Sequence, residues 1–297
     1  MGGWLLAKRA ARKPDGGCRA IRAADISTAV EKLASEAAYH LGKEELAALE
    51  RAAAEEKSPL GRATLEELLR NAAIAARGEY PLCQDTGLAV VFVDWGQDAH
   101  LVGGSLQDAV DQGVRRAQKN AYLRATVVGD PFERANTGDG TPAIVHLRLV
   151  PGDRVRLTLA AKGGGSENMS RVAMLRPGDG VEGLVAFALR AVREASGNPC
   201  PPVVVGLAAG GNFERVAELA KRALLRPLGR PNPEARYAAL ERRILDELNR
   251  TGIGPGGLGG TVTALAVHLE IAPCHIASLP VAININCHAH RHGEVEL

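Results

Sequence analysis

The stretch PLCQDTGLAVVFV, residues 81–93, separates a helical part of the chain from a strand-rich part. Residues 25–77, which precede it, carry apolar side chains at the i, i+3 and i+4 spacing of amphipathic helices. Pro81 cannot continue a helix, and the run LAVVFV that closes the stretch is typical of a buried strand. We therefore expect an α+β fold, with a helical N-terminal region, a soft subdivision near residue 80 and a mixed α/β region after it.

The rest of the chain alternates between strand patterns and helix patterns. Apolar runs and alternation predict strands, whereas helical periodicity predicts helices. The expected strands are 143–150, 154–161, 203–207, 261–270 and 279–286, and the expected helices are 106–119, 181–196, 212–226 and 233–250. The first two strands flank Pro151 and Gly152, which are typical turn residues, so these strands are expected to form a hairpin.

Residues 1–22 are expected to lie outside the folded domain, which would span residues 23–297. Their short apolar stretch precedes a cluster of basic residues. A secretory signal has these two features in the opposite order, so we interpret residues 1–22 as a disordered extension.

Composition argues against several classes of function. The 297 residues carry a formal net charge of +2 and only 3% aromatic residues, which disfavours nucleic-acid binding through charge or base stacking. No apolar run approaches the ~20 residues that a membrane helix needs. The five cysteines are an odd number without a compact disulfide framework, a pattern typical of a cytoplasmic protein with free or metal-bound thiols.

Three cysteines lie in separate turns that are rich in glycine, proline or asparagine. They are Cys83 in PLCQDTG, Cys200 in NPCPP and Cys287 in NCHAHRH. Thiolates brought together from distant turns predict a metal or iron–sulfur site with one open position, where a substrate can bind. Cys274 lies close to Cys287 in the sequence, and spacing alone leaves open which of the two is the third ligand.

Two glycine-rich segments and one arginine are further candidates for a binding site. KGGGSEN, residues 162–168, follows an expected strand, and its backbone N–H groups could hold an anion. GIGPGGLGG, residues 252–260, is similar in composition, but neither segment has the spacing of a nucleotide-binding loop. Arg124 is a candidate carboxylate clamp, because guanidinium binds carboxylate through two parallel hydrogen bonds.

Five motifs, in order along the chain, resemble those of one enzyme family. They are CQDTG, KGGGSENMS, NPCPPVVVG, GIGPGGLGG and HIASLPVAININCHAHRH. The resemblance is to the alpha subunit of two-subunit class I fumarate hydratases, which depend on an iron–sulfur cluster, and it runs from Asp25 to Leu297. L-tartrate dehydratase alpha subunits are close relatives of that family. The chain departs from the family pattern at Gly140, where asparagine is usual, and in GLAAGG after Val205.

The resemblance implies a hydro-lyase that reversibly adds water to fumarate to give L-malate, a reaction of the tricarboxylic acid cycle. It implies a 4Fe-4S cluster held by Cys83, Cys200 and Cys287, with Cys18 and Cys274 outside the cluster. One iron without a protein ligand would then be available to the dicarboxylate substrate.

The resemblance also assigns roles around that substrate. Gln84, Arg124, Gly165 and His275 match positions that contact the dicarboxylate, and Asp85 is the candidate acid/base residue. Further substrate contacts belong, in the family, to a second domain, which is expected to lie on a separate chain. A separate beta subunit is therefore expected to complete the site, in an assembly of two alpha and two beta chains.

Three alternatives stay open on the sequence alone. L-tartrate dehydratase shares the cluster and the elimination chemistry. A non-catalytic iron–sulfur carrier or sensor would need neither the open position nor the polar groups beside Cys83. A zinc protein could use Cys287 with the tail histidines His288, His290 and His292, although their spacing is not that of zinc fingers.

Overall fold

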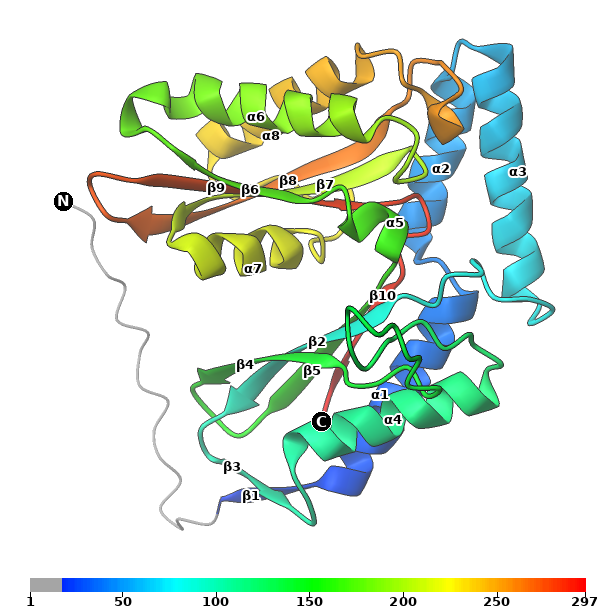
Figure 1. Ribbon diagram of the computed structural model, residues 1–297, viewed down its shortest axis with the longest axis vertical. Helices are drawn as coiled ribbons and strands as arrows, with labels where there is room; N and C mark the ends of the chain where they lie inside the picture. The colour runs from blue at the N-terminus through cyan, green and yellow to red at the C-terminus, as the bar shows by residue number, and fades with distance from the viewer. Residues whose placement is uncertain (1–17) are drawn as a thin grey trace.

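A computed structural model describes residues 18–297, which form two main sheets and the helices that cover them (Figure 1). The helices are α1 Ala23–Tyr39, α2 Lys43–Glu55, α3 Pro59–Ala76, α4 Leu106–Asn120, α5 Gly164–Glu167, α6 Gly180–Ala195, α7 Phe213–Ala223 and α8 Ala235–Asn249, with 3-10 turns η1 Pro177–Asp179 and η2 Pro255–Gly257. The strands are β1 Arg19–Arg22, β2 Leu88–Gly96, β3 Ala99–Val102, β4 Ile144–Val150, β5 Val155–Lys162, β6 Arg171–Leu175, β7 Val203–Gly211, β8 Ala264–Cys274, β9 Leu279–Asn286 and β10 His292–Glu296.

These elements stack in five layers (Figure 1). Helices α6 and α8 cover one face of the upper sheet, whose strand order is β6-β9-β7-β8, and α7 covers its other face. Below α7 lies the lower sheet, of order β10-β5-β2-β4, and its far face is covered by α1 and α4. Each sheet combines parallel and antiparallel pairs and has its own hydrophobic core. The expected mixture of helices and sheets is confirmed.

Strand β2 is buried on both faces, which explains its continuous apolar run. Val91 and Val93 pack into the core with α1 and α4. On the opposite face, the Arg222 guanidinium of α7 lies 5.3 Å from the centre of the Phe92 ring and donates to Asp94 at 2.9 Å. The two sheets are therefore joined through α7 by charge and ring contacts.

The expected hairpin between residues 143–150 and 154–161 is wrong. The two strands, β4 and β5, form at these positions but lie on opposite sides of β2. Strand β4 pairs with β2 in parallel, whereas β5 pairs with it antiparallel. Strand β2 is the more apolar segment, and it gains burial on both faces by occupying the centre of the sheet.

The strand directions of the upper sheet determine which loops lie at each of its two ends. Strand β7 pairs in parallel with β8 and antiparallel with β9. The start of β7 therefore lies beside the end of β9, with Val204 opposite Asn286. The turn between β8 and β9 lies at the opposite end of this sheet.

The helical N-terminal region forms as expected, but its helices are divided between the lower sheet and the upper sheet. Helix α1 packs against α4 and β10, whereas α2 and α3 pack against each other and beside the upper sheet. Ser58 caps α3, because its Oγ accepts the N–H of Gly61 at 3.2 Å. The subdivision near residue 80 stays a prediction.

The extension expected over residues 1–22 needs one correction. Residues 19–22 form β1, which pairs in parallel with β3. Ile21 is buried there with α1 and α4, and this burial stabilises the strand. The remainder of the expected extension, residues 1–17, lies outside the described residues. In the part of the chain from residue 18 onward, no helix combines the length and apolarity needed to cross a membrane.

Candidate active site

Three loops bring Cys83, Cys200 and Cys287 together. Cys200 precedes β7 and Cys287 follows β9, so both lie at the same end of the upper sheet. Cys83 lies in the turn that leads into β2 of the lower sheet. Burial raises the pKa of the Cys287 thiol, and the neighbouring Cys83 and Cys200 thiolates raise it too. Cys83 likewise acts with burial to raise the pKa of Cys200, so the three thiols form one group.

The turn that follows Cys83 is fixed by the side chain of Asp85. Its Oδ1 accepts the N–H of Gly87 at 2.9 Å, and its Oδ2 accepts the N–H of Gly164 at 2.7 Å. The N–H of Asp85 itself points to the Cys83 sulfur at 3.4 Å, and its carbonyl accepts from Arg291 at 2.7 Å. Asp85 thus joins the first cysteine turn to the glycine-rich turn.

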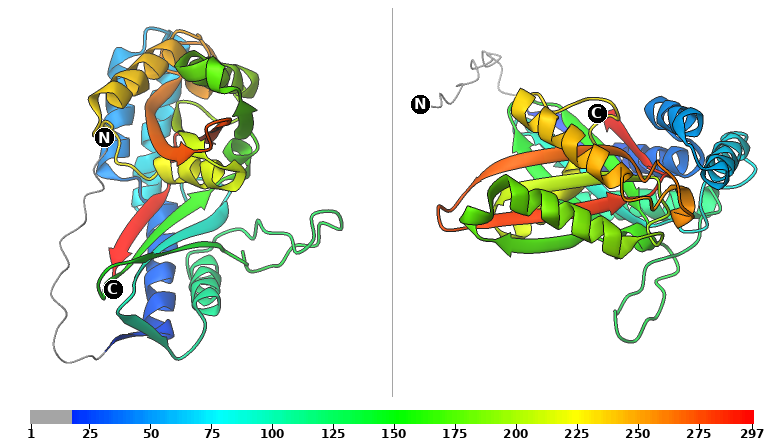
Figure 2. Two further views of the ribbon diagram at one scale, coloured as in Figure 1. Left: turned by 90° about the vertical axis from the view of Figure 1, so that its left-hand side faces the viewer. Right: turned by 90° about the horizontal axis from the view of Figure 1, so that it is seen from above.

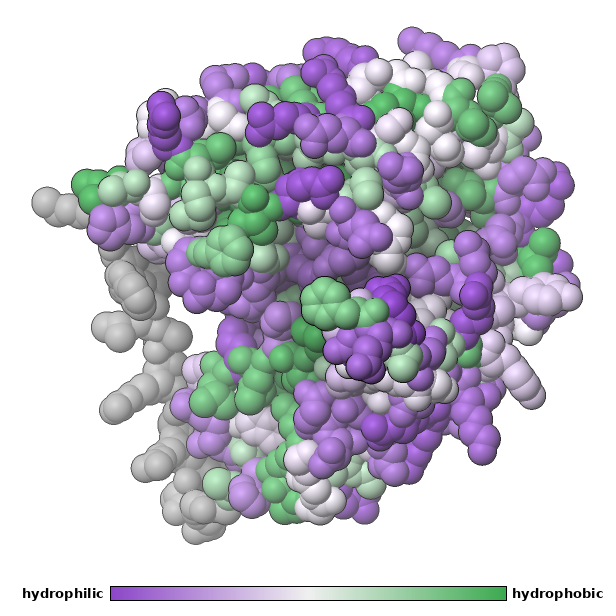
Figure 3. All heavy atoms as spheres, viewed as in Figure 1, coloured by the Kyte–Doolittle hydropathy of each residue, from purple (hydrophilic) through white to green (hydrophobic). Residues whose placement is uncertain are grey.

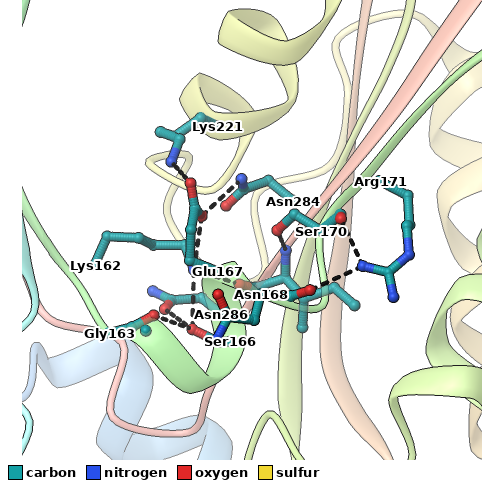
Figure 4. Close-up of polar contacts among 12 residues, drawn as sticks. Lys162, Gly163, Ser166, Glu167, Asn168, Ser170, Arg171, Lys221, Asn284 and Asn286 are labelled. Carbon is teal, nitrogen blue, oxygen red and sulfur yellow. Dashed lines mark hydrogen bonds and ion pairs between the residues drawn. The ribbon is translucent and has the colours of Figure 1, made fainter. Parts of the chain in front are cut away.

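The glycine-rich turn lies over a buried ammonium group (Figure 4). The Nζ of Lys162 donates to the Ser166 Oγ at 2.9 Å and to the carbonyl of Ile285 at 2.7 Å, and lies 3.2 Å from the Glu167 carboxylate. Glu167 also pairs with Lys221. Because Ile285 lies near the end of β9, Lys162 ties the glycine-rich turn to the strand that leads to the third cysteine.

The second cysteine is held from two sides. The carbonyl of Cys200 lies 3.0 Å from the Nδ1 of His288, which connects its loop to the third cysteine loop. Cys200 has a φ of 54°, a conformation that is uncommon for residues other than glycine and is concentrated at functional sites. On the other side, the carbonyl of Pro201 accepts the N–H of Gly256 at 2.7 Å. The segment GIGPGGLGG therefore supports this loop by close backbone packing.

Gly165 and Gln84 lie at the edges of the same group. A Cβ added to Gly165 would lie 3.4 Å from the carbonyl of Asn198, so this glycine rests against the loop of the second cysteine. The Gln84 side chain is exposed, and its Oε1 lies 3.5 Å from the sulfur of Cys83. Both residues are therefore beside the three thiols.

The charges around the thiols fit an anionic cofactor. Arg291 is only 3% exposed, and its Nε has no hydrogen-bond partner among residues 18–297. The guanidinium lowers the pKa of Cys287, opposing the effect of burial. Buried cations at Arg291 and Lys162 can offset the negative charge of three thiolates, and three thiols leave one corner of a cubane cluster without a protein ligand. The donor set therefore fits a 4Fe-4S cluster with one open iron.

Sequence comparison gives the family of the chain. A family model described as fumarate hydratase (Fumerase) matches residues 27–296. The chain belongs to this family. It is 40% identical over 272 residues to a provisionally named L(+)-tartrate dehydratase subunit alpha of Methanocaldococcus jannaschii, covering 90% of this chain and 95% of the relative. It is 35% identical over 246 residues to the L(+)-tartrate dehydratase subunit alpha of Escherichia coli, covering 82% of this chain and 80% of the relative.

Membership of the fumarate hydratase family makes the protein a hydro-lyase. Its relatives are named as alpha subunits, which implies a beta partner. Fumarate hydratase and L(+)-tartrate dehydratase share the hydro-lyase reaction type and differ in substrate.

In this fumarate hydratase family member, Arg124 is exposed in the segment that follows α4. Two residues further on, Thr126 donates to the carbonyl of Gly87 at 2.9 Å. This hydrogen bond holds the segment beside the turn of Asp85. The structure thus places Arg124 in a segment attached to the site.

The structure does not place His275 near the thiols of its own chain. His275 and Cys274 lie where β8 ends and turns into β9, and the Cys274 sulfur lies 3.4 Å from the carbonyl of Ser278 in this turn. The eight residues of β9 separate this turn from Cys287, a span of roughly 25 Å at ~3.3 Å per residue. Cys287, and not Cys274, therefore lies beside the other two cysteines, and its role as third ligand stays a prediction.

A second group of metal-binding side chains is occupied by protein contacts. Ligand atoms of Glu45, His290 and His292 lie within 4.8 Å of one another. Both ring nitrogens of His290 already have partners, the Asn286 amide at 2.6 Å and the carbonyl of Leu224 at 2.8 Å. Among residues 18–297, this group with two tail histidines contains no cysteine, which disfavours the zinc alternative.

Sequence reasoning missed Lys162 and Arg291 as site residues. Both are buried cations inside motifs that it singled out, Lys162 in KGGGSEN and Arg291 in NCHAHRH, but neither was given a role. A lysine or arginine beside a cysteine or glycine motif usually indicates a solvated charge. Only the fold shows that these two are enclosed between the sheets.

The stability of the protein is expected to depend on the charge of Lys162. Burial lowers the pKa of Lys162 from 10.5 to about 8, with Glu167 opposing the shift. Below pH 8, Lys162 is protonated in both the folded and the unfolded state, and the full free-energy cost of burying its charge lowers the stability of the fold. Between pH 8 and 10.5 the unfolded chain binds more protons than the folded one, so the free energy of unfolding rises with pH, by a total on the order of 3 kcal/mol.

Urea unfolding of the cluster-free protein at pH 7 and pH 9.5 tests this. Between pH 7 and pH 9.5, the free energy of unfolding of the unmodified protein should rise relative to that of Lys162→Met. Lys32→Met, which removes an exposed lysine, should show the same difference at both values. A pH-independent difference for Lys162→Met would contradict the expectation.

Proposed function

We propose that this chain is the alpha subunit of an iron–sulfur hydro-lyase that adds water to fumarate, or removes it from L-malate. The convergence of Cys83, Cys200 and Cys287 beside the Asp85 carboxylate carries the proposal. The three thiols would hold a 4Fe-4S cluster. When bound, this cluster would supply a Lewis acid that polarises the bond between carbon and hydroxyl in the substrate.

The residues of the chain would orient the dicarboxylate and move one proton. Arg124 offers a bidentate partner for one carboxylate, and Gln84 offers an amide beside Cys83. The exposed Gly165 lies beside the second cysteine loop and lets a substrate approach the backbone there. These contacts fix which face of the substrate meets the thiols.

Asp85 is our candidate for proton transfer. Each carboxylate oxygen accepts one backbone N–H, which fixes its position and leaves further lone pairs. Dehydration of malate removes a proton from one carbon and hydroxide from the next. Asp85 lies on one side of the substrate and can assist only one of these two removals. A second acid or base is therefore needed on the other side of the substrate.

We assign that second group to a beta subunit, in an assembly of two alpha and two beta chains. The position of His275 is consistent with an assembly that contains two alpha chains. It lies at the end of the upper sheet opposite its own Cys287, so a substrate contact by His275 would require the site of another alpha chain.

L(+)-tartrate is the second candidate substrate, and the names of the relatives favour it. Tartrate carries one more hydroxyl than malate, and the same elimination of water would give an enol that converts to oxaloacetate. A site that hydrogen-bonds this extra hydroxyl would reject malate, because its polar groups would then be left without partners.

Because the C-terminal stretch LEIAPCHIASLPVAININCHAHRH resembles that of fumarate hydratases, we expect the reconstituted two-subunit enzyme to prefer L-malate. Comparing kcat/KM for L-malate and L(+)-tartrate under argon tests this expectation. A preference for malate of tenfold or more, about 1.4 kcal/mol of transition-state stabilisation, would support fumarate hydratase activity. A tenfold preference for tartrate would instead assign the chain to the tartrate dehydratases.

A further inference from the structure

A long segment between α4 and β4, residues 121–143, extends away from the body of the protein (Figure 2). Its outer part, residues 127–137, forms a small hairpin that we call the arm. The N–H of Gly129 donates to the carbonyl of Ala135 at 2.8 Å, and the N–H of Thr137 donates to that of Val127 at 2.9 Å. The arm is therefore an ordered structure built from its own backbone hydrogen bonds.

The tip of the arm is a turn organised by Asp130. Its Oδ1 accepts the N–H groups of Phe132 and Glu133, both at 2.7 Å, and its carbonyl accepts the N–H of Arg134 at 3.0 Å. These bonds leave Phe132 92% exposed. Figure 3 shows a hydrophobic group among hydrophilic ones at the front of the molecule, over this segment.

The root of the arm is attached to the candidate active site. Thr126 donates to the carbonyl of Gly87, which follows the turn of Asp85, at 2.9 Å. On the other side, Asp139 pairs with Arg115 of α4 at 2.7 Å. The arm thus stands on the rim of the site, close in sequence to Arg124.

A single exposed apolar side chain is common and carries no argument by itself. Here the aromatic ring stands on a turn with three hydrogen bonds, and it is almost fully exposed among residues 18–297. Ordering a turn costs conformational entropy, so a turn that is already ordered removes part of this cost from binding. Aromatic side chains held in this way are typical anchors of protein interfaces.

We propose that Phe132 inserts into an apolar pocket of the beta subunit and anchors the interface between the two subunits. This inference rests on the two-subunit function proposed above. The beta subunit is the occupant because the root of the arm contacts the Asp85 turn, which the partner must approach to complete the site. The charged neighbours Asp130, Glu133 and Arg134 would form the polar rim around the anchor.

Affinity between the purified alpha chain and its cognate beta subunit, measured by calorimetry, tests the proposal. Phe132→Ser should weaken binding roughly 30-fold, the equivalent of about 2 kcal/mol. The melting temperature of the alpha chain alone should not change, because Phe132 is exposed. Asp130→Ala should weaken binding by a smaller factor, because it loosens the turn but keeps the ring.

Val181→Ser provides the matched control. It removes a side chain that is 53% exposed in α6, on the face of the upper sheet opposite α7. Unchanged affinity in Phe132→Ser, or an equal loss in Val181→Ser, would overturn the inference while leaving the proposed function intact. A change in the self-association of alpha chains, with beta binding retained, would overturn it in favour of a second alpha copy. If the unmodified chains do not associate, the two-subunit function itself fails.

Discussion

Replacing Cys83, Cys200 or Cys287 by serine is expected to prevent stable cluster loading and to lower activity more than about 100-fold. The expected loss exceeds the 10- to 100-fold effect typical of residues that only orient a metal ligand. Each substitution removes one of three thiols that the fold gathers from separate loops, and serine is a poor ligand for a cluster that prefers thiolate. Neither of the other two cysteines lies in these three loops, so neither can replace a missing ligand.

Iron and sulfide content, with the broad visible absorbance, should be recorded after anaerobic reconstitution of each alpha variant. This readout does not depend on turnover. Cys274→Ser is the matched control, because Cys274 is exposed in the turn between β8 and β9, and Cys18→Ser is a second control. Full loading in Cys287→Ser together with loss in Cys274→Ser would contradict the assignment.

Much of the fold could be predicted from local sequence patterns. The helices of residues 25–77 have strong periodicity, and LAVVFV of β2 is a short run, rich in valine and phenylalanine, that favours a buried strand. Strand pairing was harder to predict. The strands β4 and β5 are adjacent in sequence and separated by a turn-like dipeptide, which suggests a hairpin that does not form. Which strand lies between them depends on burial by α7 and α1, and this is a property of the whole fold.

The candidate site shows the same division between local and long-range information. Turn context identified three cysteines, and the family resemblance selected Cys287 over Cys274. The strand directions of the upper sheet now provide an independent reason, since β9 carries Cys287 back to the loop of Cys200. The same directions separate His275 from this group, which no motif could show.

Lys162 and Arg291 were missed because a sequence shows which residues are charged but not which charged residues are buried. Lys162 ends β5 and reaches across to β9, and Arg291 follows the third cysteine and reaches back to the Asp85 turn. Both contacts connect segments more than a hundred residues apart. Only after the sheets are stacked do these side chains become part of the site.

Without a beta subunit, the cluster-loaded alpha chain is expected to turn over L-malate at less than about 1% of the rate of the complex. The reason is chemical, because Asp85 can act on one side of the substrate only, and a missing acid or base typically costs 10²- to 10⁴-fold. Cys200 is also exposed, while Cys83 and Cys287 are half-buried, so water reaches the site from the side of Cys200 until a partner covers it. An obligate interface that excludes water in this way is expected to bury about 2,000 Å² or more.

Co-expression with the cognate beta subunit should restore turnover and give one larger species on size exclusion. The matched control is Asp85→Asn, a nearly isosteric change that keeps an oxygen able to accept the N–H of Gly87 or Gly164. This variant should assemble with the beta subunit and load its cluster, yet remain inactive, which separates assembly from proton transfer. Turnover by the reconstituted alpha chain alone at a rate comparable with the complex would show that the acid and the base both reside in this chain, and would exclude the two-subunit mechanism.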